Sequence, residues 1–106
     1  MILATTETIA GKRIVKTLGL ARGSSVRARN VGTDIMAMMR NMVGGEVPEY
    51  TKLIAEAREQ ALDRMVEQAE ELGADAVVAV RFQTTEMMQH AAELLAYGTA
   101  VSLADE

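Results

Sequence analysis

The sequence predicts a single α+β domain, residues 1–106, in which one long helix packs on one face of a mainly antiparallel sheet. Two segments, 31–42 and 48–72, have the 3.6-residue apolar period of amphipathic helices. Four other segments alternate or run apolar, as strands do: 2–5, 13–29, 76–84 and 93–103. A length of 106 residues is that of one domain. The predicted order is therefore β-β-α-α-β-β.

The long helix has local signals at both of its ends. Pro48 suits the first turn, where its missing N–H would have no partner, and Gly73 is the expected left-handed stop. Its apolar positions recur in steps of three and four residues: Tyr50, Leu53, Ile54, Ala57, Ala61, Met65, Ala69 and Leu72. Because three of these are alanines, the stripe is flat and a sheet can approach it closely. The opposite face is charged: Lys52, Glu56, Glu59, Asp63, Glu67, Glu70 and Glu71.

The strands are predicted from their side-chain patterns. Residues 76–80 are five apolar residues in a row, which suits a strand buried on both faces. Residues 93–103 alternate and are expected to pair antiparallel with 76–84 as a hairpin, with 85–91 as the connection. The segment 13–29 is either one long strand kinked near residues 23–25 or two short strands.

Composition excludes several classes of function. The net charge of −4 and the pI near 5.0 give no electrostatic footprint for nucleic acid or an anionic membrane. Without an apolar run of about 18 residues we expect no membrane span, and the cytoplasm is the expected location. The absence of cysteine excludes disulfides, thiolate zinc sites and cysteine nucleophiles.

The predicted core is thin. Aromatic residues make up only 3% of the chain, tryptophan is absent, and alanine and methionine supply much of the apolar bulk. Large aromatic side chains usually dominate the buried area of a core. Open sheet edges also invite pairing with another chain. Both features predict that the protein associates with copies of itself.

Arg81 is the leading candidate for a functional side chain. It follows an apolar strand segment that is suited to burial, so its charge needs a partner. The interpretation that we favour is an ion pair with Glu93 or Glu46, within a subunit or across an interface. The alternative is an anion site at a subunit junction.

Other polar residues give weaker signals. Glu46 and Tyr50, four residues apart at the start of the helix, either hold a ligand or serve as a helix cap and a core tyrosine; we favour the second. A catalytic cleft would be expected around Arg81, Glu46 and Tyr97. Because no nucleophile–base–orienter set can be assembled, we do not expect an enzyme.

A metal site is the one cofactor that the sequence suggests, and we commit to no ligand set for it. Met38 and Met42 lie at i and i+4, and thioether sulfur suits soft ions such as Cu(I). The favoured alternative is that these methionines fill the core. His90, the single histidine, is a further weak candidate, and Met87 and Met88 lie just before it.

Several motifs together resemble one known family. The segments GGEVPEYT, ELGADAVVAVRF and AYGTAV, in this order, resemble YbjQ-like proteins, which are short bacterial and archaeal proteins of unestablished function that carry a heavy-metal-binding description. The chain departs from the pattern at Asp75, where the family often has asparagine. The resemblance implies a dodecin/YbjQ-like subunit that assembles into a ring-shaped homopentamer, with short extra strands helping assembly.

The expected function follows from these points together. The first hypothesis is a non-catalytic, homo-oligomeric cytoplasmic protein that binds a small ligand or metal ion at subunit interfaces. The alternative is a structural or protein-interaction module without metal. The third hypothesis, an enzyme, is the one that the sequence supports least.

Overall fold

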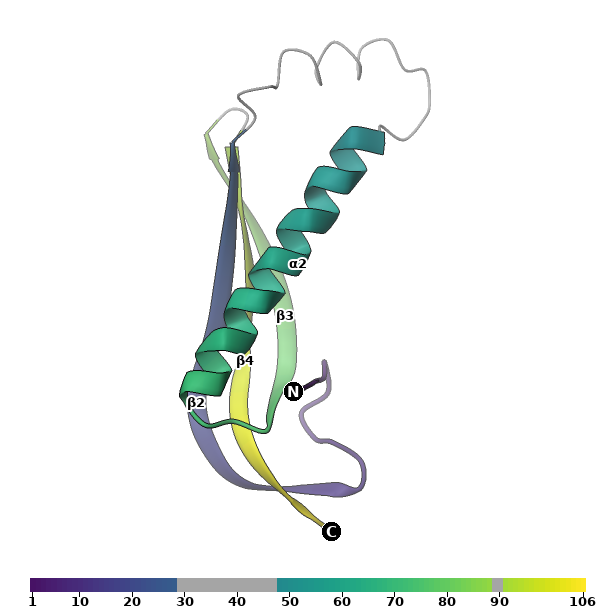
Figure 1. The fold of residues 1–106 in the computed structure, drawn as a ribbon, viewed down its shortest axis with the longest axis vertical. Coiled ribbons are helices and arrows are strands. Elements are labelled where there is room, and N and C mark those ends of the chain that lie inside the picture. Colours follow the sequence, from purple (N-terminus) through teal and green to yellow (C-terminus); the bar gives the residue numbers. More distant parts are fainter. Residues whose placement is uncertain (29–47, 89–90) are drawn as a thin grey trace.

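A computed structural model describes residues 1–28, 48–88 and 91–106 (Figure 1). The predicted helix over 31–42 lies outside these residues. In chain order the elements are β1 (Ile2–Leu3), β2 (Lys12–Ala28), α2 (Pro48–Glu71), β3 (Ala76–Met88) and β4 (Ala91–Asp105). The helix agrees with the predicted range of 48–72 to within one residue.

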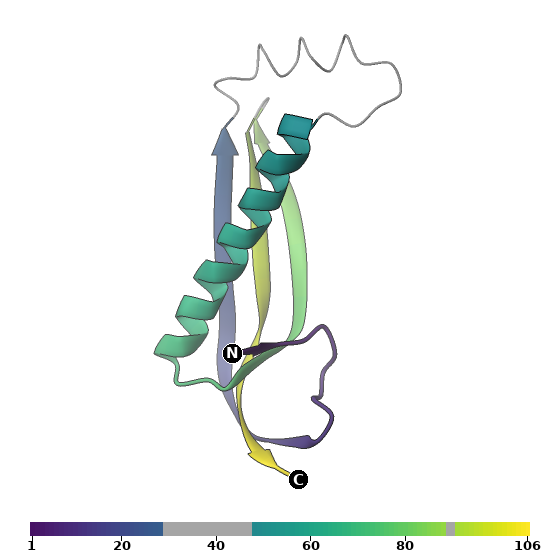
Figure 2. The ribbon, with the colours of Figure 1, turned by 45° about the vertical axis from the view of Figure 1, so that its right-hand side comes forward.

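The four strands form one sheet in the order β1-β3-β4-β2. β4 pairs antiparallel with both β2 and β3, and only the two-residue strand β1 pairs in parallel, with β3. α2 runs diagonally across one face of this sheet (Figures 1 and 2). The prediction of one helix on a mainly antiparallel sheet, with the last two strands as a hairpin, is confirmed.

Two predictions about the strands were wrong. Residues 85–88 and 91, predicted as a connection, belong to the hairpin, because backbone pairing such as Thr85 with Glu93 continues without an alternating side-chain pattern. The segment 13–29 is one strand, Lys12–Ala28, but no kink lies at residues 23–25. Its register shifts lie earlier, between Ile14 and Lys16 and between Thr17 and Gly19.

The core lies where small side chains let the helix and the sheet touch. The central helix positions Ala57, Ala61, Met65 and Ala69 are buried, as the stripe predicted. A Cβ on Gly23 of β2 would overlap backbone atoms of Ala61 and Met65, so the helix backbone lies directly on this strand. The sheet side is completed by small or branched residues: Ala21, Val77, Val80, Ala96 and Ala100.

The ends of the helical stripe are less covered than predicted. Ile54 and Leu72 are each 41% exposed. Toward Pro48 the helix diverges from the strands (Figure 1), and Ile54 belongs to this end of the helix. Leu72 follows the last helical residue, where the chain turns at Gly73 with the expected left-handed φ of 79°.

A bulge in β3 changes which side chains face the helix. Ala79 has a φ of 54°, and the pairing with β4 shifts register between Val78 and Arg81. Val77 and Val80 therefore both join the core beneath α2, whereas Val78 packs in a second cluster. That cluster lies on the other face, with Ala76, Val101, Ile9, Ile14 and Leu103. The prediction that this strand segment is buried on both faces is confirmed.

Replacing Gly23 with alanine should destabilise the protein by roughly 2–3 kcal/mol, because the new methyl group has to push the α2 backbone away from β2. The measurement is the urea midpoint of unfolding. Ser24→Ala, at the next position and on the opposite face of the sheet, is the control and should change stability by less than about 0.5 kcal/mol. Equal midpoints for the two variants would contradict the close contact.

One exposed ion pair joins the start of β2 to the end of β4, with Lys12 Nζ donating to Asp105 Oδ1 at 2.5 Å. The hydrogen bond first, and then the Coulomb attraction, lower the pKa of Asp105 and raise the pKa of Lys12. The depressed carboxyl pKa gives stability above the ordinary value of 3.8 that is lost as the pH falls through the folded-state pKa. The raised lysine pKa gives stability below 10.5 that is lost as the pH rises.

An NMR titration of the Asp105 carboxyl tests this pair. In Lys12→Gln, the pKa of Asp105 should return toward 3.8, because both causes of its shift are removed. In the control Lys16→Gln it should stay depressed. Superimposable titrations of Asp105 in the wild type and Lys12→Gln would show that the pair does not form in solution.

Candidate functional site

The face of the sheet opposite α2 is the candidate functional surface. In β2, Ala21 and Gly23 lie against the helix, so the alternate residues Leu20, Arg22 and Val26 point to the other side. Leu20 is 56% exposed and Val26 is 52% exposed, so the described parts of the chain leave them largely uncovered. The uncovered face, as we call it, comprises Leu20, Arg22, Val26, Arg81, Leu95 and Tyr97.

Three side chains from three strands lie in one row across this face. Tyr97 of β4 pairs with Arg81 of β3 on one side and with Arg22 of β2 on the other. Side chains that are directly opposite on neighbouring strands lie close enough to interact. The row therefore places one arginine on each side of one tyrosine, in a chain whose net charge is −4.

Arg81 is exposed, which corrects the prediction that it is buried. The bulge at Ala79 is the reason, because it turns Val80 toward the helix and Arg81 toward the uncovered face. Its Nη1 donates to the carbonyl oxygens of Thr5, at 2.9 Å, and Val80, at 2.8 Å. Within residues 1–28, 48–88 and 91–106 the one ion pair is Lys12–Asp105, so the predicted pair of Arg81 with Glu93 is not formed there.

The structure brings together some of the predicted site residues. Glu93 pairs with Thr85 and lies on the same face as Arg81 and Tyr97, four residues along β4 from the tyrosine. Tyr50 lies in the first turn of α2, but its side chain is outside the described part of the structure. Four other candidates lie entirely outside it: Glu46, Met38, Met42 and His90.

Sequence reasoning missed Arg22. The alternation along β2 places it on the same side as Leu20, but this pattern does not say which side the helix covers. Its position beside Tyr97 depends on the register between two strands that are far apart in the chain. The contact of Gly23 with α2 is the observation that assigns Arg22 to the uncovered face.

Side chains of α2 cover part of the outer edge of β2. Gln68 Oε1 accepts a hydrogen bond from the backbone N–H of Arg22 at 2.6 Å, and Arg64 Nη1 donates to the carbonyl of Ser24 at 2.5 Å. The buried hydroxyl of Ser25 donates to Gln60 Oε1 at 2.7 Å. In the middle of this edge, the N–H of Arg22 and the carbonyl of Ser24 therefore have hydrogen-bond partners within the subunit. We had predicted open edges that pair with another chain.

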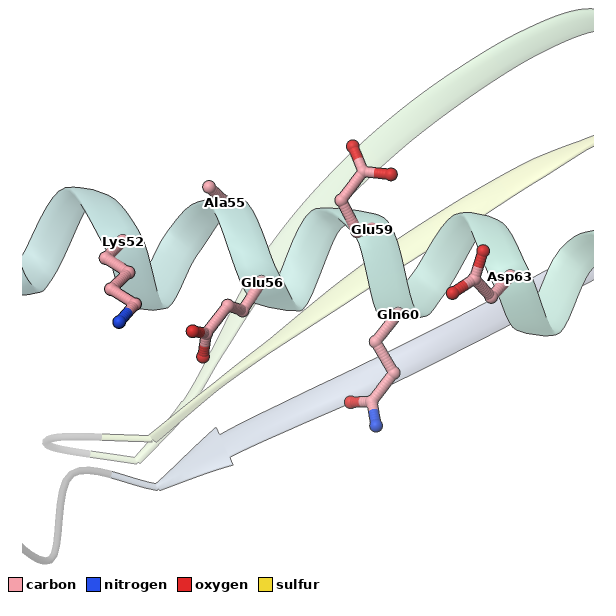
Figure 3. A pocket seen from close by; sticks show the side chains of 6 residues that line it. All are labelled: Lys52, Ala55, Glu56, Glu59, Gln60 and Asp63. Carbon is pink, nitrogen blue, oxygen red and sulfur yellow. The ribbon is translucent and has the colours of Figure 1, made fainter.

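The described residues also form a shallow hollow of about 480 Å³ along α2. Its six lining residues all belong to the helix: Lys52, Ala55, Glu56, Glu59, Gln60 and Asp63. Their carboxylates point in different directions and do not converge on one position (Figure 3). In the described ranges no three histidine, cysteine, aspartate or glutamate side chains gather as metal ligands. No described helix is long and apolar enough to cross a membrane.

Comparison with known proteins assigns the chain to a family. The family model described as "Putative heavy-metal-binding", of the YbjQ type, matches residues 1–104. The chain is a YbjQ-like protein. YbjQ-like relatives include a UPF0145 protein of Methanosarcina acetivorans, 62% identical over 103 residues that cover 97% of each chain. A UPF0145 protein of Clostridioides difficile is 54% identical over 106 residues, covering 100% of this chain and 95% of that protein. The resemblance found in the sequence is confirmed.

One solved structure has a similar fold. It is a crystal structure of a protein of unknown function from Pediococcus pentosaceus, of the DUF74 family. The TM-score is 0.58, the identity is 17%, and the match covers 98% of each chain. At this identity the likeness concerns the fold alone, and it supports the small α+β architecture described above.

Arg81→Ala should lower the free energy of unfolding by about 1 kcal/mol, because two hydrogen bonds to carbonyl oxygens, one exposed and one partly buried, are lost. Lys16→Ala, which removes another exposed charge, should have an effect below about 0.5 kcal/mol. The measurement is urea denaturation of each variant. A loss of roughly 3–5 kcal/mol for Arg81→Ala would instead indicate a buried charge whose partner has been left alone.

Proposed function

We propose that this YbjQ-like protein is a non-catalytic homo-oligomer that holds a small ligand or a metal ion where its subunits meet. The observation that carries the proposal is the uncovered face, where Leu20 and Val26 are more than half exposed beside Arg22, Tyr97 and Arg81. Arginine and tyrosine are enriched at the centres of protein interfaces, and clustered exposed apolar side chains mark contact surfaces.

The shape of the subunit supports association. Its extents are 55 × 24 × 16 Å and its radius of gyration is 17.3 Å, whereas a compact domain of this length has a radius of about 13 Å. Such a thin subunit buries little of its own surface, and a second copy adds burial on the side that α2 leaves bare. We propose the pentameric ring that the resemblance implies, acting in the cytoplasm.

The chemistry of the described residues decides between kinds of ligand. Heavy metals prefer thiolate, imidazole and thioether ligands, but the chain has no cysteine. In the described residues of one subunit no three histidine, cysteine, aspartate or glutamate side chains gather, so these residues do not fit a heavy-metal site. A metal ion held by the described residues would need donors from several subunits. The guanidinium groups of Arg22 and Arg81 repel cations, so the uncovered face suits an anionic group better.

A structural or protein-interaction module without metal is the second candidate. It is favoured by the open form of the hollow along α2, which does not enclose a ligand. Small-molecule sites usually bury most of their ligand. In this alternative the arginines and the tyrosine meet groups of another protein surface. Our prediction that the protein is not an enzyme applies to both candidates.

Native mass spectrometry of the untagged protein tests the proposal, first alone and then with Cu(I), Zn(II), Ni(II) or inorganic phosphate. We expect an oligomer that takes up an ion or phosphate in fixed proportion and releases it when the oligomer dissociates. A bare oligomer that binds none of these probes supports the interaction module. A monomer at micromolar concentration would contradict the proposal as a whole.

A further inference from the structure

We propose that the uncovered face of one copy packs against the outward side of α2 in a second copy. This inference rests on the proposed function, because it assumes a homo-oligomer, and it names the two surfaces that meet. Its basis is complementary charge. The uncovered face presents two arginines, and the outward side of α2 presents a regular row of carboxylates.

The outward side of α2 carries five exposed acidic residues in steps of three, four, four and three. We call them the acidic stripe: Glu56, Glu59, Asp63, Glu67 and Glu70. These steps place all five on one side of the helix, opposite the buried positions such as Ala61 and Met65. Like charges at i and i+4 repel each other, so in a single copy the stripe is destabilising. A basic partner surface removes that cost.

The spacings of the two surfaces match. Arg22 and Arg81 lie two strands apart in the sheet, so their Cα atoms are separated by roughly 10 Å. Two turns of an α-helix rise by roughly 11 Å. Carboxylates two turns apart on the stripe, such as Glu59 and Glu67, therefore reach both arginines at once. Glu93, which is partly buried, lies on the same side of the sheet, four residues along β4 from Tyr97.

Apolar side chains accompany the charges on both surfaces. Leu20 and Val26 are half exposed, and Leu95 and Tyr97 lie between them and β3. Beside the acidic stripe, Val66 is only partly buried. Apolar contact supplies affinity, and charged pairs select the partner and its register. The combination fits a specific contact between two folded subunits.

The symmetry of such an assembly follows from the positions of the two surfaces. The stripe and the uncovered face lie on opposite sides of each subunit, because α2 covers only one face of the sheet (Figure 2). A contact between two different surfaces is head-to-tail, and repeated head-to-tail contacts close into a ring when the rotation between subunits permits. Every interface then contains one uncovered face and one stripe.

Charge reversal tests this arrangement. Arg22→Glu with Arg81→Glu places two carboxylates opposite the stripe, and Glu59→Lys with Glu67→Lys places two ammonium groups opposite the arginines. Each pair of changes alone should weaken association by roughly tenfold or more. The chain that combines all four substitutions should recover the wild-type mass, because both arginine positions then face a charge of opposite sign again. The measurement is native mass spectrometry across a dilution series.

The controls separate folding from association. Lys16→Glu makes the same charge change as Arg22→Glu on the same strand, but outside the uncovered face, and it should keep the wild-type mass. Far-UV circular dichroism shows whether each variant is folded. If the oligomer keeps its mass after either charge reversal, or if the combined variant does not reassemble, the contact between the uncovered face and the acidic stripe is wrong. The proposed function would then stand, and the uncovered face would bind a different surface. A monomeric wild type overturns the proposed function as well.

Discussion

The direct contact between the backbone of α2 and β2 at Gly23 is the constraint on which the rest of the structure depends. Because the contact leaves no room for a side chain at Gly23, the residues beside it are also small, as Ala21, Ala96 and Ala100 are. A small-residue layer brings the helix close to the sheet but buries little area per residue. Stability then depends on close fit rather than on large buried side chains, and among the described side chains of α2 Met65 is the one large side chain that is fully buried in this core.

The same close approach explains how the candidate site arises. With α2 held over β2 and β4, Gln68 and Arg64 each form one hydrogen bond with the backbone of the outermost strand. Along this part of β2 every second residue then faces the helix, and the residues between them, Arg22 among them, face the opposite side of the sheet. The bulge at Ala79 adds Arg81 to that side. The uncovered face is thus a product of where the helix lies.

The sequence predicted those features that depend on local chemistry. Pro48, the helical period and Gly73 define α2 almost to the residue, because each acts through its own backbone or its immediate neighbours. The bulge could not be predicted, since alanine gives no signal for a positive φ, and the exposure of Arg81 depends on it. The Arg22–Tyr97 pair depends on a register between segments about 75 residues apart in the chain, which side-chain periodicity does not determine.

The hydrogen bonds from α2 to the outer strand have a consequence for misfolding. Gln68 and Arg64 belong to the helix, so if the helix detaches it takes away the cover of the apolar layer and the partners of the strand backbone in the same step. The partly unfolded chain then presents an unpaired strand next to a bare hydrophobic surface, which together are a template for cross-β growth. For this subunit, local melting of one helix and the first step of aggregation are a single event.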